Sequence, residues 1–211
     1  MTQARAWVLL RSKRRFDLLN PTPLDWELSD LAEGEARTFR WGGSSVWDWP
    51  LSVAQHSLLT LEIHRAAAPT GLSTALELAN LVHDGAEALG VRWDPITPVK
   101  PFLGEGFHAM DRAIQRAIHL RLGLPPDLPV EWKKAIKDAD RRAAAAEALH
   151  VAGWSPQEIR TTLKIRLAPL MDDPLVRRYG GTPWEPWPMR LAEERFLTEL
   201  ERLLRRHCPG N

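Results

Sequence analysis

The sequence predicts an all-α fold built as a single domain of 211 residues. Two observations lead to that prediction. Along most of the chain, apolar residues recur at the three- and four-residue spacing of amphipathic helices, and several of these stretches carry residues that start or end helices. Signals for strands are weak, and the two candidates for a brief pairing are Trp7–Leu10 and Ser45–Trp49. The length suits one sizeable hydrophobic core.

The expected elements follow in chain order. Residues 17–23 are expected to form a loop, and 40–45 a turn-rich segment that contains two glycines. Gly123 follows Leu122 where a helix C-terminus favours glycine. Ser155 starts a helix, because Pro156 takes the first helical position and Glu158 stands three residues after the cap. The stretch 172–188 is expected to be irregular. The predicted helices span 30–37, 51–68, 72–89, 101–122, 129–151, 156–169 and 189–207.

Composition limits the partners. The 28 basic and 27 acidic residues leave a net charge of +1, which predicts no nucleic-acid polymer and no membrane surface as a partner. The sequence contains no run of eighteen apolar residues, so no membrane-spanning helix is expected. In Met1–Phe16 a short apolar patch precedes the basic residues, the reverse of a secretory signal, so a first strand or helix is expected there. One cysteine, Cys208, indicates a reducing compartment and a cytoplasmic location.

The pair His83-Asp84 stands at the end of the apolar run 76–82. Polar groups in such a run are unfavourable unless something uses their charge, and a bound metal would do so. Histidine offers a nitrogen suited to Mn, Fe, Co, Ni or Zn, and aspartate an oxygen that also suits Mg. Two ligands hold an ion poorly, so others must come from elsewhere. His56, in a predicted helix, is a candidate, although a lone histidine on an apolar face is usually structural.

The fourth candidate is Asp140. It stands four residues after Ile136 and three before Ala143, on the apolar face of the predicted helix 129–151. Asp138 stands four residues from both Lys134 and Arg142 and suits surface ion pairs. Glu147 also faces inward, either as an acceptor behind a metal ligand or as part of a core salt bridge.

Six segments carry a further signal: Phe16–Pro21, Arg40–Gly43, Ser52–Ser57, Val82–Ala88, Ile96–Lys100 and Lys137–Asp140. Together they resemble a known family, the HD-domain phosphohydrolases related to the bacterial 5′-deoxynucleotidases. The resemblance implies an HD-type helical bundle with a central metal site. It also implies one domain over 1–211, with the motifs in about 16–150 and the helices of 151–211 packed on them. Its expected ligands for one divalent ion (Mn, Co, Zn, Mg, Fe or Ni) are His56, His83, Asp84 and Asp140.

The resemblance implies that Glu87 activates the attacking water. Its spacing agrees, because a residue four after His83 would lie on the same face of a continuous helix. A carboxylate there can orient or deprotonate a water. The alternative is a structural carboxylate that bonds Arg40 or a loop.

Four residues are the expected contacts of the substrate. Arg40 matches a phosphate-binding arginine, and Trp41 would stack on a base or wall the pocket. Asp94 matches a residue near the sugar or phosphate, although the interval from Glu87 is about two residues longer than in the family. Lys100 would meet a phosphate tail or lie on the surface.

The expected function is metal-dependent hydrolysis of (deoxy)nucleotides, with slight preference for 5′-nucleotidase removal of phosphate from nucleoside monophosphates. The alternatives are a dNTP triphosphohydrolase, a hydrolase of another phosphate compound, and a non-catalytic nucleotide-sensing module that keeps the metal. Shared ligand geometry does not separate the first two. Glu87 favours an enzyme, because a pure binder needs no water-activating carboxylate. A homo-oligomer is expected only by analogy with the family.

Overall fold

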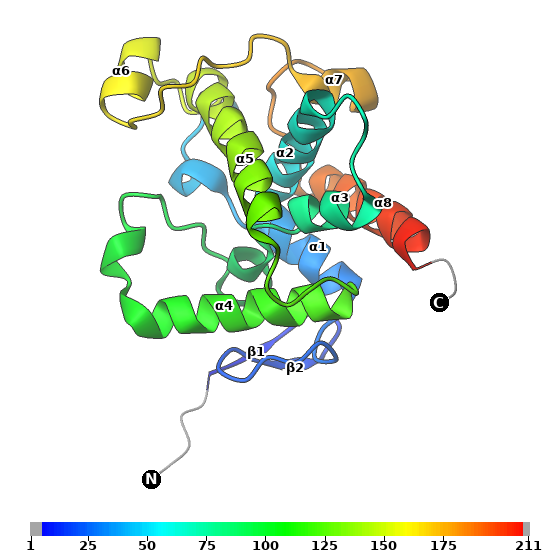
Figure 1. Cartoon of the computed structure of the whole chain (residues 1–211). Coiled ribbons are helices and arrows are strands. Elements are labelled where there is room, and N and C mark those ends of the chain that lie inside the picture. The colour runs from blue at the N-terminus through cyan, green and yellow to red at the C-terminus, as the bar shows by residue number, and fades with distance from the viewer. Residues whose placement is uncertain (1–5, 209–211) are drawn as a thin grey trace.

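The computed structural model describes residues 6–208, and helices dominate that part of the chain (Figure 1). This confirms the predicted all-α class in its coarse form. A small antiparallel hairpin pairs β1 (Trp7–Leu9) with β2 (Arg15–Asp17). Trp7–Leu10 was thus a correct strand candidate, whereas Ser45–Trp49 forms no strand. Of the N-terminal element expected in Met1–Phe16, residues 1–5 lie outside the described part.

Helices α2, α4, α5 and α8 lie close to their predicted ranges. Ser52, Ser73 and Ser155 cap α2, α3 and α6 with their side chains. No helix within residues 6–208 combines the length and the apolarity needed to cross a membrane. The helices are α1 (Leu28–Arg37), α2 (Val53–Ala67), α3 (Thr74–Leu81), α4 (Gly104–Arg121), α5 (Val130–His150), α6 (Pro156–Thr161), α7 (Pro174–Tyr179) and α8 (Met189–His207).

The core is formed where α2 packs against α5 and where α8 packs against α1 and α3. Helix α8 contributes Phe196, Leu200 and Leu203, all fully buried, to the same cluster as Leu31 of α1 and Leu58 of α2. Full burial of one such side chain stabilises the fold by roughly 1.5–3 kcal/mol. The C-terminal helix therefore shares one hydrophobic core with the segments that carry the candidate site.

The predicted helix 72–89 is wrong in its second half. Helix α3 ends at Leu81, and the chain turns through Val82–Asp84 before a π-helical turn over Glu87–Val91. Gln115 of α4 explains the break: its side-chain amide donates to the Val82 carbonyl at 2.8 Å and accepts from the Ala86 N–H at 3.0 Å. These bonds satisfy backbone groups that a continuous helix would have paired, so the turn is stable.

Two other ranges differ from prediction. The helix expected over 156–169 ends at Thr161, and Lys164 adopts a left-handed φ of 58°, which a helix interior does not allow. The stretch 172–188, expected to be irregular, contains α7. Its start is capped by Asp173, whose side chain accepts from the Leu175 N–H at 2.9 Å.

Candidate metal centre

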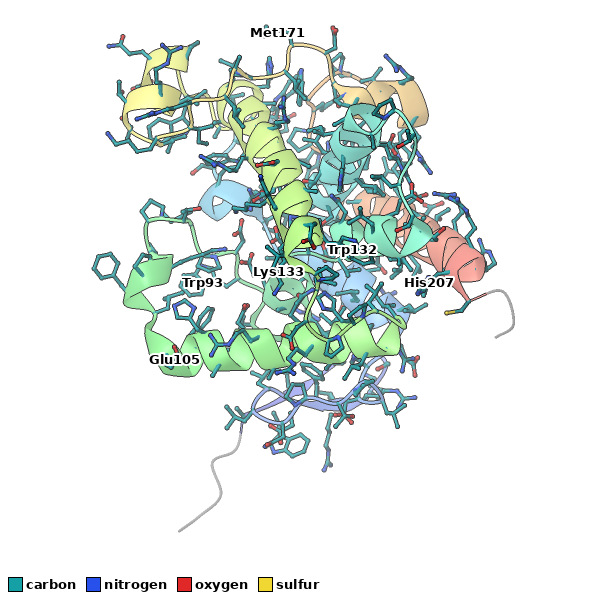
Figure 2. The ribbon with its side chains drawn as sticks, viewed as in Figure 1. Trp93, Glu105, Trp132, Lys133, Met171 and His207 are labelled. Carbon is teal, nitrogen blue, oxygen red and sulfur yellow. The ribbon has the colours of Figure 1, made fainter. Side chains whose placement is uncertain are left out.

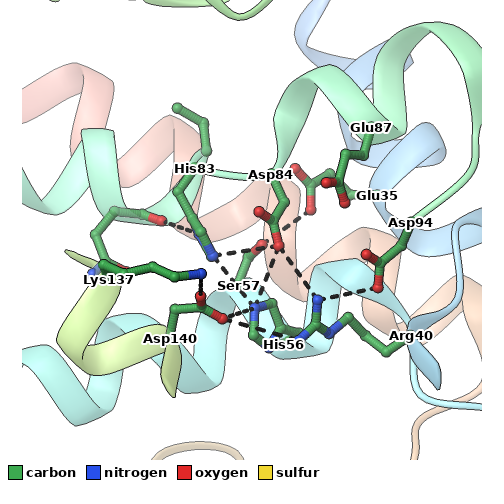
Figure 3. Close-up of polar contacts among 12 residues, drawn as sticks. Glu35, Arg40, His56, Ser57, His83, Asp84, Glu87, Asp94, Lys137 and Asp140 are labelled. Carbon is green, nitrogen blue, oxygen red and sulfur yellow. Dashed lines mark hydrogen bonds and ion pairs between the residues drawn. The ribbon is translucent and has the colours of Figure 1, made fainter. Parts of the chain in front are cut away.

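The imidazole rings of His56 and His83 lie close together, tilted by 47° and with their centroids 5.2 Å apart (Figure 3). His56 lies in the first turn of α2 and is fully buried, and His83 lies in the turn after α3. Their Nε2 atoms are 3.3 Å apart. Nδ1 of His56 is 2.5 Å from Glu147 Oε1, and Nδ1 of His83 is 2.8 Å from the Asn80 carbonyl oxygen. Because both Nδ1 atoms face acceptors, both rings direct Nε2 at one point, as metal-ligating histidines do.

Two carboxylates approach the same point. Asp84 Oδ2 lies 3.3 Å from His83 Nε2 and 3.4 Å from His56 Nε2. Asp140 Oδ1 lies 3.5 Å from His56 Nε2. One ligand atom each from His56, His83 and Asp140 falls within 4.8 Å of the others, so this group could hold a metal ion. As its spacing predicted, Asp140 is buried while Asp138 is exposed.

The charges and burial of the cluster favour the ligating forms of Asp84, Asp140 and His83, but not of His56. Burial alone would raise the pKa of Asp84, but the two histidines and Arg40 outweigh it and lower that pKa. The pKa of Asp140 is lowered against its burial in the same way. Burial lowers the pKa of His83, so this ring is neutral at pH 7. Two carboxylates and a neutral imidazole are the species that bind a metal without first losing a proton.

Glu147, on α5, stands behind His56 and is fully buried. Besides His56, it accepts from Arg40 Nε at 3.4 Å and from Trp41 Nε1 at 3.2 Å. Burial and Arg40 lower the pKa of His56, but Glu147 and the two aspartates outweigh them and raise it well above its usual value. Glu147 therefore fixes the ring of His56 and also belongs to a core salt bridge, the two alternatives that the sequence left open.

Arg40 lies among carboxylates rather than on a free surface. Its Nη1 is 3.1 Å from Asp94 and 3.8 Å from Asp84, and Asp94 is itself buried. Trp41 and Gly42 have left-handed backbone angles, with φ of 59° and 63°, and this turn directs both Arg40 and Trp41 toward α5. A phosphate would have to compete with Asp94 for this guanidinium.

Glu87 lies in the π-helical turn and is nearly buried. Its Oε1 accepts from Lys100 Nζ at 2.8 Å, and its Oε2 is buried and has no hydrogen-bond partner within the described range 6–208. Burial and the charge of Asp84 raise the pKa of Glu87 to about 9, against the opposing effect of Lys100. The prediction that Glu87 shares a helix face with His83 is wrong, because no continuous helix joins these two residues. The charge of Asp84 nevertheless acts on Glu87 and raises its pKa. Lys100 is half-exposed and bonds Glu87.

Glu35 of α1 was not singled out from the sequence. It is fully buried, accepts from Ser57 Oγ at 3.1 Å, and leaves Oε1 without a partner among residues 6–208. Burial and the charge of Asp84 raise its pKa well above the usual value, which favours the neutral form of this carboxyl group. Figure 3 draws it beside Glu87 and Asp84. An acid on the apolar side of the predicted helix 30–37 was the signal that could have revealed it.

A cleft of about 360 Å³ between α4 and α5 opens onto the cluster. Its wall includes His83, Asp84 and Asp140, so the candidate ligands can be reached from outside. Figure 2 labels Lys133 at the end of α5 that lies nearest to α4. None of the cations that line the cleft was proposed from the sequence, because they come from two helices whose packing no local pattern reveals. They are Arg112, Arg116, Lys133 and Lys137.

Among known proteins, no family model matches the chain. A protein of Rhodobacter capsulatus, described only as uncharacterized, is 46% identical over 154 residues. The match covers 73% of this chain and 77% of the relative. The description of the relative names no activity and therefore assigns none.

Proposed function

Because the chain belongs to the same family as this Rhodobacter capsulatus protein, which brings no activity with it, we propose a function from the site itself. The protein is a divalent-metal-dependent phosphohydrolase of the HD type that acts on (deoxy)nucleotides. The observation that carries the proposal is the pair of Nε2 atoms, 3.3 Å apart, beside Asp84 and Asp140. Two histidines and two aspartates leave coordination positions open, as catalytic sites require.

The donor set fits a divalent ion. Both rings have Nδ1 held by an oxygen, and Asp84 and Asp140 are ionised. Such an ion would polarise a phosphate oxygen and lower the pKa of a water. The mixture of imidazole and carboxylate ligands suits Mn, Fe, Co, Ni or Zn and does not exclude Mg.

Glu87 would take the proton of the attacking water at Oε2, the oxygen that Lys100 leaves free. Lys100 holds the other oxygen and orients the carboxylate. A cation at the cluster would oppose the effect of Asp84 and lower the pKa of Glu87 toward the working range of a general base. Arg40 holds Glu147 and Asp94 in place, and it would contact phosphate only after leaving Asp94.

The expected reaction, carried over from the resemblance, releases phosphate from a nucleoside 5′-monophosphate. Release of triphosphate from a dNTP is the second candidate. The cations of the cleft between α4 and α5 favour this alternative. A sensing module that binds nucleotide and metal without turnover is a further candidate, and the buried Oε2 of Glu87, which has no partner in the described part of the chain, speaks against it.

The test starts from protein stripped of metal and resupplied separately with Mn, Co, Zn and Mg. Each form is given a panel of ribo- and deoxynucleoside mono-, di- and triphosphates, and the products are separated by chromatography. We expect turnover with at least one metal and a loss of about 100-fold or more in Glu87→Gln. The matched control is Glu201→Gln, a change at an exposed position of α8. Absence of turnover with every metal would overturn the enzyme proposal.

A further inference from the structure

Two polar side chains of α4, Gln115 and His119, stand one helical turn apart and link the turn after α3 to the loop after α4. The side-chain amide of Gln115 donates to the Val82 carbonyl at 2.8 Å and accepts from the Ala86 N–H at 3.0 Å. Its nitrogen also lies 2.9 Å from Nε2 of His119. Nδ1 of His119 lies 3.2 Å from the Pro126 carbonyl oxygen. The proposed reaction uses neither side chain.

These partners determine which form of the His119 ring fits. The Pro126 carbonyl can only accept, so Nδ1 of His119 carries a proton. The Gln115 amide has its oxygen on the Ala86 N–H, so its nitrogen donates to Val82 and to Nε2 of His119, which must accept. A neutral ring with its proton on Nδ1 meets both demands. An imidazolium does not, because its second N–H would face the N–H of Gln115.

The surroundings of His119 favour this neutral form. The side chain is buried in the wall of the cleft between α4 and α5. Burial lowers the pKa of His119, and Lys133 of α5 acts in the same direction, whereas the Pro126 carbonyl and Asp127 oppose them. The ring is therefore neutral at pH 7 and takes up a proton only in more acidic solution. The other titratable or charged groups that line the cleft are His83, Asp84, Arg112, Arg116, Lys137 and Asp140.

The turn that Gln115 holds is the one that carries two candidate ligands, His83 and Asp84, between Val82 and Ala86. If the amide turns away, the Val82 carbonyl and the Ala86 N–H lose their partner, which is unfavourable for backbone groups in the interior. The turn would then relax, and the two ligands would leave their positions beside His56.

We infer that His119 is a positioning residue for the metal centre. Its neutral ring holds the Gln115 amide, and this amide holds the turn that carries His83 and Asp84. A proton on His119 releases the turn and weakens metal binding. The inference rests on the metal site of the proposed function, although not on hydrolysis or on the substrate. In acid, the metal should therefore be bound more weakly than protonation of its own ligands accounts for.

The protonation state of the ring can be read directly. Long-range proton–nitrogen NMR correlations of the metal-free protein at about pH 7.5 distinguish the two ring nitrogens, and His119→Gln identifies the signals by removing them. We expect a proton on Nδ1 of His119 and none on Nε2. An imidazolium, or a neutral ring with its proton on Nε2, would overturn the inference.

The pH dependence of metal affinity tests the coupling. Competition against a chelator would give the zinc dissociation constant between about pH 5.5 and 7.5 for wild type, His119→Gln and His119→Leu. Glutamine can accept from Gln115 but takes no proton, so His119→Gln should bind zinc within about threefold of wild type at the upper pH, whereas His119→Leu should bind about tenfold more weakly. As the pH falls, wild type should lose affinity more steeply than His119→Gln, by up to about tenfold per pH unit. His108→Gln is the matched control, since this histidine lies on α4 outside the cleft.

Parallel pH profiles for wild type and His119→Gln would overturn the inference and leave the metal site intact, as would unchanged zinc affinity in folded His119→Leu. Failure of wild type to bind zinc at any pH would overturn the inference and the metal site together. Conversely, a profile that depends on His119, together with no nucleotide turnover, would support the inference and contradict the enzyme. The two claims therefore fail in distinguishable ways.

Discussion

Replacement of Glu147 by glutamine should weaken metal binding although Glu147 is not expected to touch the metal. The carboxylate is fully buried and lies 2.5 Å from Nδ1 of His56. It holds the ring so that Nε2 points at His83, 3.3 Å away. Loss of such an acceptor behind a metal-ligating histidine typically lowers affinity 10- to 100-fold, or about 1.4–2.8 kcal/mol.

The same change acts on stability. Glu147 also accepts from Arg40 and Trp41, so glutamine leaves up to three donors to share one amide oxygen. Breaking a buried ion pair costs about 3–5 kcal/mol. Arg40 keeps Asp94 at 3.1 Å, so we expect the lower end of that range in the metal-free protein.

Two measurements separate these effects. Competition against a coloured chelator gives the metal dissociation constant, and urea unfolding in excess chelator gives the stability of the metal-free protein. Asp138→Asn, a change at an exposed position of α5, is the control for loss of an acidic side chain on that helix. If Glu147→Gln binds metal as tightly as wild type while remaining folded, the orienting role of Glu147 is refuted.

Three further changes test the surroundings of the site. The folded protein holds a proton on Glu87, pKa about 9, that the unfolded chain releases near 4.5, so metal-free stability should fall as pH rises from 5 to 8. Glu87→Gln should remove most of that fall in urea unfolding. In Gly34→Ala the new Cβ would collide with the Ala88 carbonyl, and we expect thermal unfolding to show a loss of about 1–3 kcal/mol, unlike Gly106→Ala, where space is open. Gln115→Ala should leave the backbone groups beside His83-Asp84 without their partner and lower the free energy of unfolding by about 1–3 kcal/mol, measured with urea. It should also weaken metal binding in the chelator assay. Gln157→Ala, a change at an exposed position, should change neither quantity.

Local patterns were sufficient where one helix buries one face. Helix α8 occupies the range 189–207 that its apolar spacing predicted, between Pro188 and Cys208. Asp140 was separated from Asp138 by the same spacing, and its burial follows from it. In these cases the residues that decide the structure are neighbours on one helix.

Local patterns failed where a distant side chain decides the backbone. Gln115 is more than twenty residues from Val82 and Ala86, yet it takes their hydrogen bonds and ends α3 early. This turn, and not a continuous helix, brings His83 and Asp84 next to His56. The cleft escaped prediction for the same reason, since it exists only where α4 and α5 face each other.

The partners of Arg40 also could not be deduced from its neighbours in sequence. The expected phosphate-binding arginine is held by Asp94 and Glu147, which lie far along the chain. Burial makes these pairings strong, because an unpaired guanidinium there would be unfavourable. The sequence therefore indicated charged residues that the fold brings close together, whereas tertiary packing decides which of them are free to meet a ligand.

Metal content tests the central claim most directly. Wild type, Asp140→Asn and Asp138→Asn would be stripped, reloaded with one divalent metal, dialysed and measured by elemental analysis, with folding checked by circular dichroism. We expect wild type and Asp138→Asn to retain about one ion per chain and Asp140→Asn to lose most of it, because Asp140 shares the cluster with His56 and His83. Equal metal in all three folded proteins would contradict the account.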